Sequence, residues 1–224
     1  MPKRIPLQRR GRAKPKFRPR THKSLGKIEL PKQENTGIIL DLLHDNIKSA
    51  PIMKVRFGKD VMLLAATNGS RVGENIMIHK LADLPEGSLV CNVESRPGAG
   101  PKLIRSAGGA GRIVGKEGKL TSVLLPSKEI KKIHSECRAI VGRVAGAGMT
   151  EKPMLKAGAG FYAMKAKGII WPRVRATKKN AVDHPFGGGG KTLGKKKTVS
   201  RHASPGRKVG SISARRTGKR RGKK

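Results

Sequence analysis

The sequence is poor in acidic residues, aromatic residues and cysteine. Its 224 residues include 14 Asp and Glu against 51 Lys and Arg, which gives a formal net charge of +37 at pH 7. Aromatic residues make up 3% of the chain, and the two cysteines, Cys91 and Cys137, form no CxxC pair. No Cys/His cluster has the spacing of metal ligands. We therefore expect two reduced thiols in the core, and neither a metal site nor a cofactor.

Long apolar runs are also absent. No stretch approaches the ~20 apolar residues of a membrane-spanning helix, and the N-terminus has the positive charge of a signal peptide without its apolar segment. Residues 1–33 contain five prolines, and residues 187–222 contain nine glycines. Neither end can therefore form the long amphipathic helix that would bind a membrane surface. We expect a soluble chain with no membrane partner.

The positive charge is concentrated at the two ends of the chain. Residues 1–33 carry 12 Lys and Arg against one acid, and residues 171–224 carry 18 against one. Residues 34–170 are closer to electrical balance, with 21 Lys and Arg against 12 Asp and Glu. The ends repel themselves and hold too few apolar residues to fold alone. They favour a polyanionic partner, and nucleic acid is the natural one because each neutralised phosphate releases counterions.

The middle of the chain has the pattern of an all-β fold. Short runs rich in Ile, Val and Leu alternate with turns that carry Gly, Asn or Asp, and residues 57–60 (FGKD) indicate a hairpin. This pattern predicts small antiparallel barrels or sandwiches. A break near residues 84–88 divides the runs into two sets, so we expect two barrels in tandem. One short helix is expected within residues 153–167.

A glycine-rich segment at residues 187–192 (GGGGKT) has the ending of a nucleotide-binding P-loop. The full motif needs a glycine where Pro185 stands, a buried strand before it and a helix after it. The flanking segments, ATKKNAV and LGKKKTVS, are polar. We therefore do not predict nucleotide hydrolysis.

The residues before that segment suggest a binding loop. Residues 180–190 (NAVDHPFGGGG) contain four consecutive glycines, which allow the backbone to approach a neighbour closely and to present N–H groups to phosphates. A flexible linker is the alternative, although a linker would not need Asp183, His184 or Phe186. A Ser-His-Asp triad requires a rigid scaffold, which this basic stretch lacks. A histidine that binds RNA is therefore favoured over a catalytic one.

Further glycine-rich basic segments lie at residues 96–119 and 137–148. They are either solvated turns or loops that press their backbone against RNA. The six aromatic residues of the chain are too few for a platform on which single-stranded bases stack. Recognition of folded RNA by its shape and phosphates is the better fit.

Several sequence blocks resemble one protein family. They are HDNIKSAPIMKVRF, LPEGSLVCNVESRPG, CRAIVGRVAGAG, EKPMLKAGAGFYAMKAKGIIWPRVR, NAVDHPFGGGG and KTVSRHASPGRKVGSISARRTGKR. In this order they resemble the universal second protein of the large ribosomal subunit across nearly the whole chain. The phenylalanine after His-Pro is closer to the archaeal and eukaryotic branch of that family.

The resemblance implies a non-enzymatic protein of the cytoplasmic ribosome. It implies a basic extension at 1–33, an oligonucleotide-binding-type barrel at 34–85, a Src-homology-three-like barrel with a short terminal helix at 86–170, and a basic extension at 171–224. The implied partners are large-subunit rRNA, neighbouring ribosomal proteins and the small subunit across the subunit interface. The implied role is to thread basic tails into rRNA and to support subunit association and the peptidyl-transferase region. The family's His-containing loop, which approaches that region, is matched by Asn180, Asp183, His184, Pro185 and Gly187–Gly190.

No catalytic residue is expected. The residues expected to contact rRNA are mostly cationic and lie in the two ends, the glycine-rich loops and the His-containing loop. They are Arg9, Arg10, Arg12, Arg18, Arg20, His22, Lys23, Arg96, Lys102, Arg105, Arg112, Arg138, Arg143, Lys165, Lys167, Arg173, Arg175, Asn180, His184, Gly187, Gly188, Gly189, Arg201, Arg207, Lys208, Arg215 and Arg216. A nucleic-acid packaging protein is the alternative; it would need no defined loop and would bind DNA and RNA alike.

Overall fold

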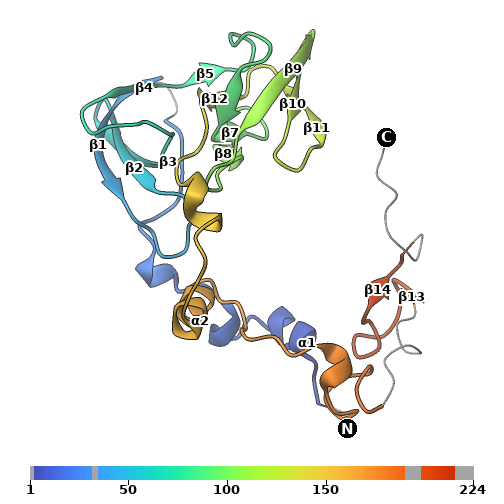
Figure 1. Cartoon of the computed structure of the whole chain (residues 1–224). Coiled ribbons are helices and arrows are strands. Elements are labelled where there is room, and N and C mark those ends of the chain that lie inside the picture. The colour runs from blue at the N-terminus through green and yellow to red at the C-terminus, as the bar shows by residue number, and fades with distance from the viewer. Residues whose placement is uncertain (1–2, 32–34, 190–197, 215–224) are drawn as a thin grey trace. The chain divides into compact units, whose positions relative to one another are not determined.

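The computed structural model describes residues 3–31, 35–189 and 198–214 of the chain (Figure 1). The chain divides into two compact units. The barrel unit is Arg20–Gly160, and the terminal unit combines Met1–Pro19 with Phe161–Lys224. No pattern in the sequence predicted that the two basic ends would meet in one unit.

A four-stranded antiparallel sheet begins the barrel unit (Figure 1). Val55 and Phe57 are buried in it while Lys54 and Arg56 are exposed, the alternation of a half-buried strand. Phe57 pairs with Asp60, which confirms the hairpin predicted at FGKD. In the order β3-β2-β1-β4, the strands are β3 (Asp60–Ala65), β2 (Ile52–Phe57), β1 (Thr36–Leu43) and β4 (Asn75–Met77).

A six-stranded sheet completes the barrel unit, and the predicted all-β fold is confirmed. In spatial order its strands are β11 (Ile130–His134), β10 (Leu120–Leu124), β9 (Gly111–Glu117), β6 (Leu89–Cys91), β12 (Arg138–Val141) and β5 (His79–Lys80). A separate antiparallel pair is formed by β7 (Val93–Glu94) and β8 (Pro101–Leu103). Because β5 pairs with β12, the chain enters the second sheet before the break expected at residues 84–88.

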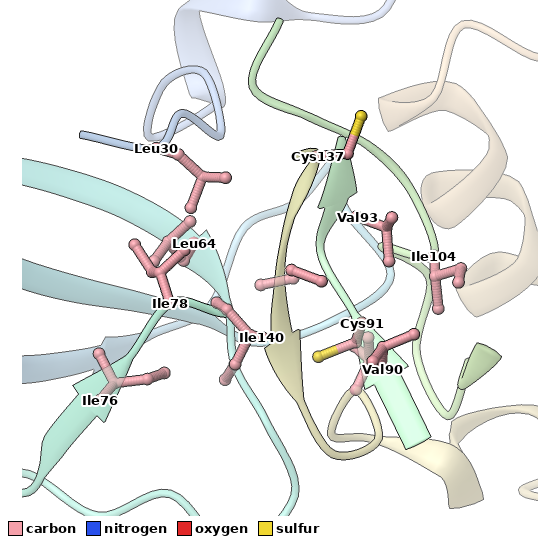
Figure 2. Packing of buried hydrophobic residues seen from close by; sticks show 14 of the residues in the cluster. Leu30, Leu64, Ile76, Ile78, Val90, Cys91, Val93, Ile104, Cys137 and Ile140 are labelled. Carbon is pink, nitrogen blue, oxygen red and sulfur yellow. The ribbon is translucent and has the colours of Figure 1, made fainter. Parts of the chain in front are cut away.

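One hydrophobic core serves both sheets. Figure 2 shows members of this cluster, including Leu64 from the first sheet and Val90 and Ile140 from the second, and none of these three is more than 2% exposed. A hydrogen bond adds to the connection: Asn92, between β6 and β7, donates from Nδ2 to Ala65 O at 2.8 Å. The two sets of strands therefore share their apolar interior.

Both cysteines are buried free thiols within this core (Figure 2). Burial raises the pKa of Cys91 to about 12. Burial, together with the negative charge of Glu94, raises the pKa of Cys137 to about 11. Both thiols stay protonated at neutral pH and are poor nucleophiles, as expected for residues that fill a core.

Short elements make up the terminal unit. α1 (Pro6–Gly11) has a proline at its first turn, where the missing N–H costs nothing, and Ile5 N donates to Gln8 Oε1 at 3.1 Å. α2 (Ala157–Ala166) spans the boundary of the two units and confirms the helix predicted within residues 153–167. β13 (Thr198–Val199) and β14 (Ser211–Ile212) form a parallel pair. Single-turn 3₁₀ helices occur in both units, at Pro15–Phe17, Thr21–Lys23, Ala147–Thr150 and Ala176–Lys178.

Close backbone contacts join the two ends of the chain in the terminal unit. Lys3 N donates to Val182 O at 3.1 Å. Gly168 lies against the N-terminal segment, where a Cβ would be 2.6 Å from Arg18 C. Ile5 and Val209 supply buried apolar surface. No helix among the described residues has the length and apolar character needed to span a bilayer.

Candidate nucleic-acid interface

The His-containing loop consists of tight turns closed by backbone hydrogen bonds. His184 N donates to Asn180 O at 3.2 Å, and Gly188 N donates to Lys179 O at 3.0 Å. Gly187 packs against the start of the loop, where a Cβ would lie 2.3 Å from Asn180 O and 2.4 Å from Lys179 O. The sequence predicted a close backbone approach at these glycines. At Gly187 the close neighbour is the chain's own backbone.

His184 is placed to donate one hydrogen bond. Its Nδ1 accepts the Phe186 N–H at 3.0 Å, and the two rings lie 5.3 Å apart with a tilt of 59°. Burial lowers the pKa of His184, and the positive charge of Lys179 lowers it further. A neutral ring with Nδ1 as acceptor carries its proton on Nε2. Nε2 is therefore the donor that remains for a ligand.

The geometry of this loop gives no support to catalysis or nucleotide hydrolysis. Asp183 Oδ1 lies 3.7 Å from Lys3 Nζ, while His184 Nδ1 is occupied by a backbone amide, so the two groups of an acid–base pair have other partners. Residues 181–186 form turns, where a P-loop would need a preceding buried strand. Residues 190–197, which complete GGGGKT and follow it, lie outside the described part of the chain. Among the described residues no group of three or more His, Cys, Asp or Glu could hold a metal ion.

A buried carboxylate organises the first glycine-rich basic loop. Glu94 is 0% exposed, and it accepts the Gly100 N–H at 3.1 Å and the Gly98 N–H at 3.4 Å. It also pairs with Arg138, whose Nη2 lies 3.0 Å from Glu94 Oε1 and whose backbone N donates to Oε2 at 3.0 Å. Arg138 Nη1 donates in turn to Pro31 O. One carboxylate thus fixes the conformation of the loop and its attachment to β12.

The charge state of Glu94 follows from these contacts. Burial would by itself raise the pKa of Glu94, but the hydrogen bonds and charge of Arg138 hold that pKa below its usual value. The neighbouring cations Arg96, Lys102 and Arg105 are exposed. Arg138 differs from them, because its guanidinium binds Glu94 and Pro31. Its assignment as an RNA ligand stays a prediction.

A pocket of about 960 Å³ adjoins this loop. Gly98 and Gly100 contribute to its wall. Of the described residues that line the pocket, Glu29 is the acidic one. Cations dominate the rest of the wall, and those that are exposed are Lys27, Lys80, Lys102 and Arg105. A concave surface with this excess of positive charge favours a phosphate-rich ligand.

Asp45 is a second buried carboxylate with several donors. Its Oδ2 accepts Ser24 Oγ at 2.7 Å and the Leu25 N–H at 2.9 Å, while Oδ1 accepts the Ile47 N–H at 2.7 Å. Lys48 Nζ lies 2.8 Å from Oδ2. Burial alone would raise the pKa of Asp45, but these donors and the Lys48 charge hold it well below its usual range. The cluster ties residues 24–25 to the turn between β1 and β2.

Most of the residues predicted to bind rRNA are exposed. Arg138, Lys167, His184 and Lys208 are half-buried and Gly187 is buried. Arg215 and Arg216 lie outside the described residues. The exposed ones are Arg9, Arg10, Arg12, Arg18, Arg20, His22, Lys23, Arg96, Lys102, Arg105, Arg112, Arg143, Lys165, Arg173, Arg175, Asn180, Gly188, Gly189, Arg201 and Arg207. The terminal unit brings Arg9, Arg10, Arg12 and Arg18 into one body with the residues from Lys165 onward.

Sequence reasoning missed the two buried acids. Asp45 and Glu94 are 2 of only 14 acids, and each lies in or beside a turn-rich segment. At Glu94, a lone acid beside glycines and Arg96 was the available signal, since burial of a carboxylate requires several donors. Each acid also has partners 20 to 44 residues distant along the chain, such as Leu25 for Asp45 and Arg138 for Glu94. No local pattern identifies such partners.

Comparisons with known proteins agree on one family. Residues 73–207 match the family model "Ribosomal Proteins L2, C-terminal domain". The large ribosomal subunit protein uL2 of Methanococcus aeolicus is 42% identical over 240 residues, which cover 98% of this chain and 100% of that protein. The uL2 proteins of Methanocella arvoryzae and Halorubrum lacusprofundi are each 44% identical, over 97% and 98% of this chain and 99% and 98% of their own lengths.

The fold and these matches first define a class: a β-rich, strongly basic structural protein of the ribosome, and not an enzyme. Within that class, the chain belongs to the uL2 family of the large ribosomal subunit. The archaeal relatives confirm the branch that Phe186 indicated. Membership places the chain among rRNA and other ribosomal proteins.

Proposed function

We propose that the chain binds large-subunit rRNA through its exposed cations, in the terminal unit and around the Glu94-anchored loop. The observation that carries this proposal is how the charges are distributed. Among the described residues, Arg138 is the one predicted RNA ligand that forms an ion pair within the chain. The other predicted cations that the structure describes form no ion pair with an acid of the chain and are available to phosphates, and the two buried acids serve to shape the loops. Phosphate contacts of this kind supply affinity and register.

The barrel unit supplies the rigid part of this proposal. We assign residues 34–85 to an oligonucleotide-binding-type barrel and residues 86–170 to a Src-homology-three-like barrel, as the family resemblance implies. The four-stranded and six-stranded sheets and their shared core support two closely joined barrels. Barrels leave loops free for ligands while their strand edges stay protected.

The basic ends of the chain supply further phosphate contacts. They thread into rRNA on the cytoplasmic ribosome, and the His-containing loop lies toward the peptidyl-transferase region, whose chemistry RNA performs. The large subunit carrying this protein then associates with the small subunit across their interface. The tight turns of residues 179–188 support this role, because they give His184 a fixed place on an otherwise irregular segment.

Binding to large-subunit rRNA in competition with bulk duplex DNA tests the proposal. Full-length protein is mixed with labelled rRNA, and unlabelled duplex DNA is added in increasing amounts. We expect the rRNA complex to survive a large mass excess of DNA, and tagged protein to sediment with large subunits in cell extract. Equal competition by DNA and rRNA would instead identify a general packaging protein.

A further inference from the structure

The terminal unit contains a pocket that the rRNA-binding proposal does not use. Its volume is about 400 Å³, within the range of roughly 300–1,000 Å³ that is typical of ligand pockets. Its walls are aliphatic and come from distant parts of the sequence, with Ile5, Ile169, Val174 and Val209 among them. Ile5 and Val209 are 4% and 7% exposed, so this part of the apolar wall belongs to the packed interior of the unit.

Cations also contribute to the lining. Arg10, Arg173 and Lys179 contribute to it, and none of its residues is acidic. Asp183, the acid nearest to it in sequence, lies 3.7 Å from Lys3 Nζ. An aliphatic recess with cations around it matches a flat ligand that has apolar faces and a negatively charged attachment. A nucleotide has this chemistry, since its base faces are apolar and its phosphates are anionic.

His184 gives the pocket a hydrogen-bond donor. It belongs to the lining, its Nδ1 is occupied by the Phe186 N–H, and Nε2 remains as a donor. Base edges present carbonyl oxygens and ring nitrogens that accept such a hydrogen bond. None of the six aromatic residues of the chain lines the pocket, so aliphatic contacts, the imidazole and a guanidinium plane would enclose the base.

We propose that this pocket accepts one unstacked nucleobase of the bound rRNA, with the adjoining phosphates on Arg10, Arg173 and Lys179 and a hydrogen bond from His184 Nε2. The inference rests on the proposed rRNA binding and adds a specific subsite to it. It adds a base contact to the phosphate contacts of a chain that has few aromatic residues.

Filling the pocket tests the inference. Ile169→Trp and Val174→Trp introduce bulk at side chains that are 44% and 62% exposed, so the fold tolerates either change. The matched control is Ile130→Trp, at a 61% exposed position of β11 in the barrel unit. Each full-length variant is mixed with large-subunit rRNA. Affinity is measured by filter binding, and base edges are probed with dimethyl sulfate and a carbodiimide.

We expect one nucleotide to be protected by the wild type and by Ile130→Trp and to become reactive with both pocket variants. Their affinity should fall about tenfold, the order of one lost base contact, while the slope of affinity against salt stays the same. Equal affinity and equal protection for all four proteins would overturn the inference and leave rRNA binding intact. Tight binding of adenosine monophosphate, with rRNA affinity unaffected by Ile169→Trp, would also overturn it. Failure of the wild type to bind rRNA would remove the proposed function itself.

Discussion

At the scale of single residues, Asp45 and Glu94 show how a protein with a charge of +37 uses its few acids. Each carboxylate is buried and collects donors from segments that carry exposed cations. An isolated carboxylate would be costly to bury, and its hydrogen bonds remove that cost. The acids therefore hold in place the loops that carry the proposed phosphate contacts.

Removing the charge of Glu94 should destabilise the barrel unit. Glu94→Gln keeps the size of the side chain but leaves the largely buried Arg138 guanidinium without its counter-charge, and the free energy of unfolding should fall by about 2 kcal/mol. Urea unfolding followed by circular dichroism measures this. The control is Glu117→Gln, which removes a surface pair with Lys132 and should cost less than about 0.5 kcal/mol. Equal losses in the two variants would contradict the anchoring role.

Asp45 should make the stability of the fold depend on pH in the acidic range. Because its pKa is lowered in the folded state, the unfolded chain binds more protons once the pH falls below the ordinary Asp value of about 3.9. Its contribution is complete above that pH and is lost as the pH falls toward the folded-state pKa. Asp45→Asn should therefore lower the urea midpoint at pH 7, and the gap to wild type should narrow below pH 4. A gap that stays constant down to pH 2 would argue against an ionised, hydrogen-bonded Asp45.

At the scale of elements, local sequence patterns predicted the structure of neighbouring strands, but they did not predict pairings between distant segments. Runs rich in Ile, Val and Leu, separated by the turn at FGKD, predicted the hairpin of β2 and β3, because strand composition and tight turns are local features of a sequence. β5 is two residues long and pairs with β12 near residue 138, so no local period could assign it to the second sheet. For the His-containing loop, the sequence predicted a close approach but could not show that Gly187 packs on Asn180.

Gly187 should be essential to the shape of the His-containing loop. A methyl group there would lie 2.3 Å from Asn180 O, so Gly187→Ala must open the turns that fix His184. We expect rRNA affinity to fall at least fivefold and the His184 pKa, followed by NMR, to rise toward its ordinary value. Gly148→Ala is the control, because a methyl group there meets nothing within 4 Å. If both variants bind rRNA like the wild type, the loop is not part of the interface.

At the scale of the whole molecule, the two units differ in how much apolar surface they bury. Among the described residues, the continuous core lies in the barrel unit, whereas Ile5 and Val209 are the buried hydrophobic side chains of the terminal unit. Segments with few buried contacts open at lower free energy than the core. The contacts that join the two ends cross more than 100 residues, as between Lys3 and Val182, which is why sequence patterns did not reveal them.

Limited proteolysis should separate the two units. In the free protein, trypsin should trim residues of the terminal unit first and leave a resistant fragment close to residues 20–160. Added large-subunit rRNA should slow the trimming, because phosphate contacts stabilise the ordered form of the ends. Mass spectrometry of the fragments checks the boundaries. A free chain that resists trypsin throughout would contradict the difference in stability.

The central claim is that exposed cations bind rRNA phosphates, and the salt dependence of binding tests it most directly. Affinity of the full chain for large-subunit rRNA is measured from low to high salt, beside Arg9→Gln/Arg10→Gln/Arg12→Gln and the control Lys132→Gln. We expect log affinity to fall linearly with log salt, the triple variant to lose about 0.7–0.9 of slope per lost phosphate contact, and the control to match the wild type. Affinity that does not change with salt would contradict the account.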